Sequence, residues 1–217
     1  MARRTKEEAL ETRSNLLDAA EYLFQAQGVS GTSLQDIALR AGATRGAVYW
    51  HFKDKSDLFN AMMDRVTLPL ESHFNRDDAA PKTSDDPAVN ALETMRGSIL
   101  NALTQIANDA QTRRVIEIAS QKVEYVEAHK TIRQRHLAAR NFFVVRVELG
   151  LNKAAQQAGL TLAVPSAVAA HGLHALIDGL IHNWLLDPQA FNLPAAGQCV
   201  MDIYFKGLGL GAVHPRC

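Results

Sequence analysis

Apolar residues recur along the chain at the three-to-four-residue spacing of amphipathic helices, and no segment alternates in the manner of a strand. In the first such segment the apolar side chains form one helical stripe before Gly28, made of Leu16, Leu17, Ala20, Leu23 and Phe24. Further helical patterns follow at about 34–42, 45–52, 56–74, 88–108, 111–124, 127–158, 165–187 and 192–208. The pattern therefore predicts an all-α protein.

Turn residues divide the helices into a small front part and a larger body. Residues 75–87 contain two prolines and no apolar period, which predicts a loop. We expect a three-helix N-terminal domain at residues 1–55 and a larger helical domain at residues 56–217.

The two short helices at 34–42 and 45–52 have the layout of a helix-turn-helix. The tight turn Ala41-Gly42-Ala43 joins them, and a longer helix precedes them. The major groove of duplex DNA admits one helix, and Gly42 permits the sharp turn that lets the second helix protrude. The front domain is therefore predicted to bind DNA.

Charge supports this interpretation only locally. The chain has 23 Lys and Arg against 23 Asp and Glu, so its formal net charge is zero and any contact with DNA requires a patch. Between positions 40 and 55, four basic residues stand against one acidic residue, a net of +3. On the second short helix, Val48 is expected to pack inward.

A longer run around these helices resembles the DNA-binding signature of the TetR family. It covers about a quarter of the chain and reads Gly31-Thr32-Ser33-Leu34-Gln35-Asp36-Ile37-Ala38, then Ala41-Gly42-Ala43-Thr44-Arg45-Gly46-Ala47-Val48-Tyr49-Trp50-His51-Phe52-Lys53-Asp54-Lys55. It departs from the family at Ala43, where valine is frequent. Residues 3–9 and 178–185 further resemble, within that family, the multidrug-efflux repressors of the AcrR and TtgR type.

The resemblance implies which residues contact double-stranded DNA. Arg45 would read a base through its forked guanidinium, and Tyr49 would lie beside it. The complete set expected at the DNA is Ser33, Thr44, Arg45, Gly46, Tyr49, Trp50, His51 and Lys55. A basic arm with Arg3 and Arg4 either reaches the DNA as well or is simply solvated.

The resemblance also assigns the body to dimerisation and ligand binding. The last two helices would pair with those of a second copy through Leu173, Ile177, Leu180, Ile181, Trp184, Val200, Ile203, Tyr204 and Leu208. The ligand pocket would be lined by Val66, Leu92, Ile99, Ile116, Ser120, Phe143, Val147, His174 and Asp178. Each apolar member is more often part of the core than a ligand contact, whereas Asp178 and Glu124 are expected to be buried for a reason.

Other functional classes have weaker support in the sequence. His171, His174, Asp178 and His182 share one helical stripe and could ligate Zn²⁺, but a polar pocket wall or dimer seam explains them without an ion. We expect no metal, no cofactor and no enzymatic activity, since no phosphate loop, nucleophile elbow or His-Glu-x-x-His motif occurs. The opening residues lack a secretory signal and the stretch 162–181 is interrupted by polar residues, so we expect a cytoplasmic protein without a membrane partner.

The function implied is a homodimeric repressor of a multidrug efflux operon. It would bind a near-palindromic operator and leave it when a hydrophobic drug-like compound binds the body. Two alternatives stay open: a TetR-type regulator of another pathway that senses a metabolite, and an architectural DNA-binding protein without a ligand response.

Overall fold

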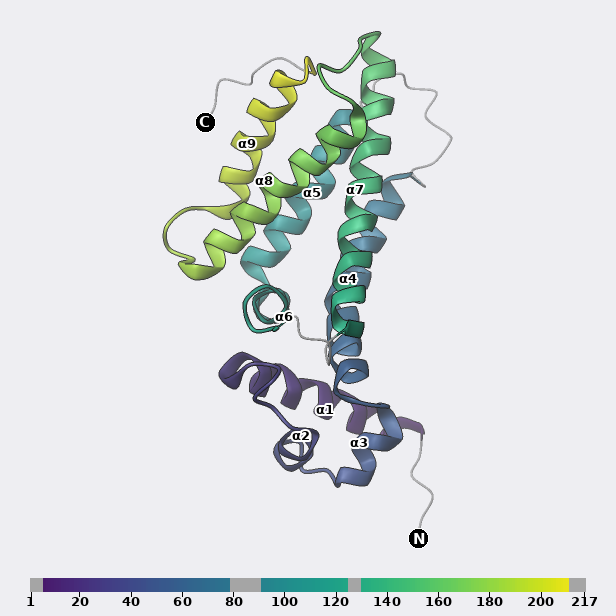
Figure 1. The fold of residues 1–217 in the computed structure, drawn as a ribbon, viewed down its shortest axis with the longest axis vertical. Helices are drawn as coiled ribbons and strands as arrows, with labels where there is room; N and C mark the ends of the chain where they lie inside the picture. Colours follow the sequence, from purple (N-terminus) through teal and green to yellow (C-terminus); the bar gives the residue numbers. More distant parts are fainter. Residues whose placement is uncertain (1–5, 79–90, 125–129, 211–217) are drawn as a thin grey trace. The chain divides into compact units, whose positions relative to one another are not determined.

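The computed structural model describes residues 6–78, 91–124 and 130–210, and for residues 68–78 the backbone alone. Nine helices and no strand form in these ranges (Figure 1). They are α1 (Lys6–Gln27), α2 (Leu34–Arg40), α3 (Arg45–His51), α4 (Lys55–Asp78), α5 (Ala91–Asn108), α6 (Ala110–Gln121), α7 (Lys130–Ala158), α8 (Ser166–Leu186) and α9 (Leu193–Gly207). The predicted all-α fold is confirmed.

One predicted boundary was wrong. The segment 75–87 was expected to be a loop, but α4 continues through its first four residues to Asp78. Polar residues alone do not end a helix, and the first proline of the segment comes only at Pro81. The rest of that segment and the basic arm with Arg3 and Arg4 lie outside the described residues.

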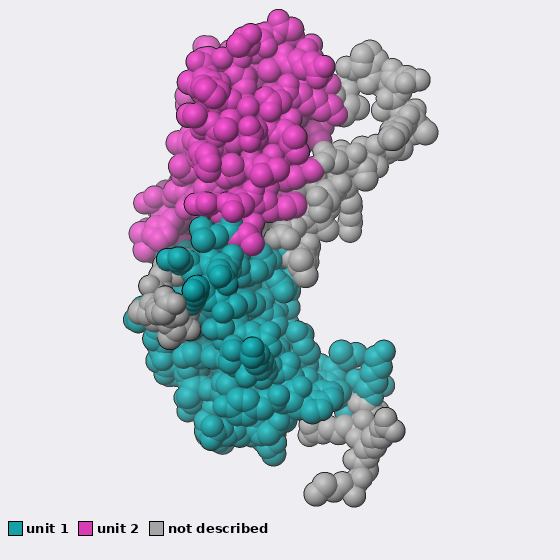
Figure 2. Space-filling view, turned by 45° about the vertical axis from the view of Figure 1, so that its right-hand side comes forward, with its two compact units in different colours: residues 1–67, 111–137 teal, residues 68–110, 138–217 magenta. Residues whose placement is uncertain are grey.

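The chain forms two compact units, coloured separately in Figure 2. Unit 1 comprises residues 1–67 and 111–137, and unit 2 comprises residues 68–110 and 138–217. The division inside α4 therefore follows Thr67, whereas the sequence pattern placed a boundary at residue 55. Unit 1 also contains nearly all of α6 and the start of α7, which the sequence assigned to the body.

The core of unit 1 forms where α1, α2 and α3 contact one another and the first turns of α4 add apolar side chains. The rings of Phe24 in α1 and Phe59 in α4 lie 5.9 Å apart. Other fully or nearly fully buried side chains in this core are Leu16, Leu17, Ile37, Val48, Leu58 and Met62. This packing fixes α3 on a rigid base.

Unit 2 is built around α5, α8 and α9, with α9 packed against both other helices (Figure 1). Arg96 of α5 and Asp202 of α9 form a buried ion pair. The Tyr204 hydroxyl donates to the carbonyl of Ala169 at 2.8 Å, and burial raises the pKa of this phenol. Tyr204 approaches α8 at Gly172, where a Cβ would collide with the phenol.

These contacts change the predicted dimer surface. Four side chains expected to face a second copy are buried within their own protomer, namely Leu173, Ile177, Trp184 and Leu208. The prediction was wrong for these four because helical periodicity marks an apolar face without saying which element covers it.

Among the described helices, none has a long enough apolar stretch to span a membrane.

Candidate nucleic-acid interface

A capping box starts α2 and sets its direction. The Ser33 hydroxyl accepts from the backbone N–H of Asp36 at 3.1 Å, and the Asp36 carboxylate accepts from the backbone N–H of Ser33 at 3.1 Å. The Ser33 hydroxyl also donates to that carboxylate at 2.6 Å. This side-chain hydrogen bond, with the backbone one, holds the pKa of Asp36 below its ordinary value.

A glycine in the left-handed conformation makes the turn between α2 and α3. Gly42 has a φ of 64°, and the following N–H of Ala43 donates to the carbonyl of Ala38 at 2.9 Å. Thr44 then caps α3, because its hydroxyl accepts from the N–H of Ala47 at 3.2 Å. The predicted helix-turn-helix is therefore present.

One face of α3 is anchored and the other is open. Val48 is completely buried, as the sequence predicted, and Phe52 just after the helix is buried as well. Tyr49 and Trp50 are 49% and 71% exposed, although both are large aromatic side chains. Exposed aromatic groups on a rigid helix indicate a binding surface.

Arg45 and Tyr49 stand one turn apart on the open face. Their side chains meet, with the guanidinium 5.6 Å from the centre of the phenol ring. Both are exposed, so the guanidinium donors remain available to an outside partner. The contact of Arg45 and Tyr49 with a base stays a prediction.

Of the four basic residues predicted to form a patch between positions 40 and 55, three are exposed in the structure. The guanidinium of Arg40 stacks on the ring of Tyr22 in α1, 3.3 Å from its centre. Lys53 is exposed beside α3. Arg40, Arg45 and Lys53 are thus exposed basic side chains of the stretch 40–55, whereas Lys55 is half-buried. Arg40 also links α2 to α1 through its contact with Tyr22.

Lys55 has a role that the sequence did not reveal. Its ammonium donates to the carbonyls of Val29, Ser30 and Thr32 at 2.7, 3.4 and 3.0 Å. Burial lowers the pKa of this amine. Lys55 therefore ties the first turn of α4 to the loop that follows α1, and its expected contact with phosphate stays a prediction.

The other predicted DNA contacts lie close together around α3. Gly46 is exposed in its first turn, and His51 packs edge-on against Trp50 with ring centres 4.5 Å apart. Ser33 and Thr44 use their hydroxyls to cap α2 and α3. The direct contact of each of these residues with DNA stays a prediction.

The predicted ligand-binding residues are divided between the units. Val66, Ile116 and Ser120 belong to unit 1, and the other six to unit 2. In unit 2 the rings of Phe143 and His174 meet edge-on at 5.5 Å. Their role in ligand binding stays a prediction.

Asp178 and Glu124 are exposed, so the expectation that they are buried carboxylates was wrong. Asp178 occupies a solvent-facing position of α8, while Glu124 accepts a hydrogen bond from Ser30 at 3.1 Å.

Within the described ranges, no cluster of three or more His, Cys, Asp or Glu side chains could hold a metal ion.

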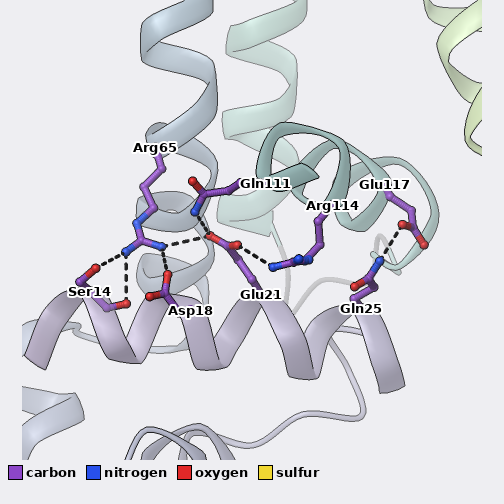
Figure 3. A network of polar contacts seen from close by, with 8 residues as sticks. All are labelled: Ser14, Asp18, Glu21, Gln25, Arg65, Gln111, Arg114 and Glu117. Atoms are coloured by element: carbon purple, nitrogen blue, oxygen red, sulfur yellow. Dashed lines mark hydrogen bonds and ion pairs between the residues drawn. The ribbon is translucent and has the colours of Figure 1, made fainter. Parts of the chain in front are cut away.

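A buried carboxylate that the sequence analysis did not single out lies in unit 1. Glu21 of α1 is contacted by side chains from α4 and α6 (Figure 3). The signal was present in the sequence, because Leu17, Glu21 and Phe24 fall on one stripe and the middle residue is charged.

Comparison with known proteins decides the family. Residues 16–62 match the model of bacterial regulatory proteins of the tetR family. Residues 90–209, more than half of the chain, match that of the C-terminal region of MAATS-type transcriptional repressors. The chain belongs to the TetR family.

Relatives in this family cover nearly the whole chain. The HTH-type transcriptional regulator TtgR of Pseudomonas putida is 38% identical over 89% of both chains. AcrR of Shigella flexneri is 38% identical over 89% of this chain and 87% of its own. The crystal structure of NalD, the secondary repressor of the MexAB-OprM multidrug efflux pump in Pseudomonas aeruginosa, has 34% identity and a TM-score of 0.81 over 97% of this chain and 100% of its own. A complex of SmeT with triclosan has 28% identity and a TM-score of 0.76 over 95% of this chain and 98% of its own.

Proposed function

We propose that this TetR-family protein is a ligand-responsive transcriptional repressor of a multidrug efflux pump operon. The observation that carries the proposal is the helix-turn-helix with α3 anchored by Val48 and Arg45 and Tyr49 open to solvent. Proteins similar to nearly the whole chain include NalD and SmeT, each of which represses a multidrug efflux pump. A hydrophobic drug-like compound bound in the larger domain would lower the affinity for the operator.

Operator binding by this family fold requires two recognition helices. Two copies of α3, set about 34 Å apart by a two-fold axis, would enter successive major grooves of a near-palindromic site. Side chains of α8 and α9 that remain exposed in the protomer supply an apolar surface for this pairing, among them Val168, Leu176 and Ile203. We therefore place the homodimer contact on α8 and α9.

Release by a ligand is a linkage between two binding equilibria. The compound must bind better to the dimer whose recognition helices are wrongly spaced than to the dimer that fits the operator. The six predicted ligand-binding residues of unit 2 are the candidates for this contact. Their mixture of apolar and aromatic groups with His174 suits a hydrophobic compound that carries one polar group.

The test is a fluorescence-anisotropy titration of the operator with and without a small panel of hydrophobic compounds. The panel is Nile red, rhodamine 6G, ethidium and triclosan. We expect specific binding to the protein's own promoter fragment and a weaker affinity when a panel member is bound. Operator binding that responds to no panel compound but responds to a polar metabolite would support the regulator of another pathway, and no response to any small molecule would support the architectural alternative.

A further inference from the structure

The carboxylate of Glu21 joins three helices of unit 1. It accepts from Arg65 Nη1 of α4 at 3.1 Å and from Gln111 Nε2 of α6 at 2.9 Å, and it lies 3.6 Å from Arg114 Nη1 of α6 (Figure 3). The Glu21 side chain is only 1% exposed. A buried carboxylate is stable only while such partners stay in place.

The partners on α4 and on α6 depend on Glu21 to different degrees. Arg65 has further acceptors on α1, since it reaches Asp18 Oδ1 at 2.5 Å and Ser14 Oγ at 2.8 Å. Gln111 and Arg114 reach α1 through the Glu21 carboxylate. Removal of the Glu21 charge therefore loosens α6 more than it loosens α4.

The far end of α6 also contacts the part of unit 1 that carries α3. Gln25 donates to the Glu117 carboxylate at 2.9 Å, and the Val29 N–H donates to the carbonyl of Lys122 at 3.0 Å. The loop 28–32 that receives this contact is the same loop whose carbonyls bind the ammonium of Lys55. A chain of hydrogen bonds thus runs from α6 through this loop to the first residue of α4, four positions after α3 ends.

The position of Gln111 gives the cluster its importance. The chain passes from unit 2 into unit 1 between Ala110 and Gln111, so the first residue of unit 1 on α6 already bonds Glu21. Gln111 is therefore the first residue of unit 1 that a displacement entering α6 along the chain would reach. A buried carboxylate that loses its partners is strongly destabilised, so intermediate positions of α6 are unfavourable. The Glu21 contact therefore suits a helix that switches between two positions.

We propose that Glu21 is the positioning residue through which displacement of α6 reaches the recognition helix α3. This inference rests on the proposed function. It adds that the Glu21 cluster and loop 28–32 set how strongly a bound ligand weakens operator binding.

The experiment compares Glu21→Gln with Asp18→Asn. Both substitutions remove one negative charge from the same face of α1, and both residues contact Arg65, but Asp18 is exposed and bonds nothing on α6 in the described contacts. For each protein the operator dissociation constant is measured with and without the panel compound that binds the wild type most tightly. The ratio of the two constants measures the coupling, and an irreversibly inactive fraction of the protein cancels in it. Urea unfolding of each variant checks that the protein is folded without the compound.

We expect the ratio to fall by about 2- to 30-fold in Glu21→Gln and to change less than about 2-fold in Asp18→Asn. Arg114→Gln, which removes the α6 side of the pair, is expected to lower the ratio in the same direction and carries the test if Glu21→Gln does not fold. The affinity of each variant for the compound alone is measured by fluorescence and is expected to stay near the wild-type value in the absence of DNA.

Two results would overturn the inference, and they differ from each other. A wild-type protein that releases its operator with the compound, together with a Glu21→Gln protein of equal ratio, removes Glu21 from the coupling and leaves the proposed function intact. A wild-type protein that binds no panel compound overturns the proposed function, and the inference with it.

Discussion

The guanidinium of Arg45 and the phenol of Tyr49 lie together on the open face of α3, with Nη2 of the arginine 3.5 Å from the tyrosine hydroxyl. The stacking restricts the arginine before any partner arrives, so less conformational entropy is lost when it binds. We therefore predict that the two side chains act on DNA as one group rather than as two independent contacts.

This relationship predicts non-additive effects on operator binding. Arg45→Ala should weaken specific binding by about 1–3 kcal/mol and reduce discrimination at one base pair. Tyr49→Ala should also weaken it, and the double variant should lose less than the sum of the two. Anisotropy titrations with the operator and with single-base variants measure all three.

Lys53→Ala is the matched control for the base-reading role. Its side chain is basic and exposed, but it lies beyond the end of α3. It should weaken binding to every DNA sequence alike and reduce the salt dependence by about one ion. An Arg45→Ala protein that behaves in the same way would contradict a contact with a base.

The structure predicts that Lys55 acts mainly on stability. Lys55→Met removes the donor from three backbone carbonyls around Val29–Thr32 and should destabilise the protein by about 1–3 kcal/mol. Urea unfolding measures the loss, with Lys53→Met as a control that should change little. Unchanged stability with weaker binding to all DNA would instead favour the phosphate contact inferred from the sequence.

The capping box of α2 predicts a dependence on pH. Ser33→Ala should destabilise the protein by about 0.5–2 kcal/mol near neutral pH, because the start of α2 loses its cap. Folding lowers the pKa of Asp36 below its ordinary value of 3.8. The ionised carboxylate therefore stabilises the folded state at pH values above 3.8, and this stabilisation is lost as the pH falls through the lower pKa of the folded state.

Because Ser33 causes this shift, the difference between wild type and Ser33→Ala should shrink as the solution is acidified. Unfolding curves at about pH 6 and about pH 3.5 measure the change. A difference that grows on acidification would show that Asp36 is not stabilised by Ser33 in solution.

The sequence was sufficient for features that depend on near neighbours in the chain. Helical periodicity located the nine helices of the described ranges, and Gly42 with Thr44 marked the turn and the start of α3. Val48 was recognised as the inward residue of α3 because its side chain is apolar. Each of these inferences rests on residues within about two helical turns.

Features that depend on distant partners were not predictable in the same way. Lys55 finds its acceptors 23 to 26 positions earlier in the chain, and Glu21 finds Gln111 after 90 positions. The sequence assigned Lys55 a phosphate contact from its place beside α3, and its bonds to the loop 28–32 could not be inferred from neighbouring residues. The same holds for Trp184, whose apolar face is covered within the protomer.

The exposed part of α9 yields a prediction about the dimer. Ile203 is 72% exposed, although its neighbours Asp202 and Phe205 are buried in unit 2. An isoleucine in water gains about 1.5–3 kcal/mol when a partner covers it, so this position is expected at the centre of the contact between two copies. Ile203→Glu should therefore shift the protein toward a monomer and, since two recognition helices are needed, weaken operator binding at least about tenfold.

Analytical ultracentrifugation measures the mass, and Val145→Glu on α7 is the matched control. Val145 is 52% exposed, so it tolerates a charge in the protomer, and it lies on neither α8 nor α9. The control should remain dimeric and bind the operator as the wild type does. A glutamate disrupts the dimer only where dimerisation would bury its carboxylate without a partner. If Val145→Glu produced the monomer while Ile203→Glu stayed a dimer, the contact between copies would therefore lie on α7.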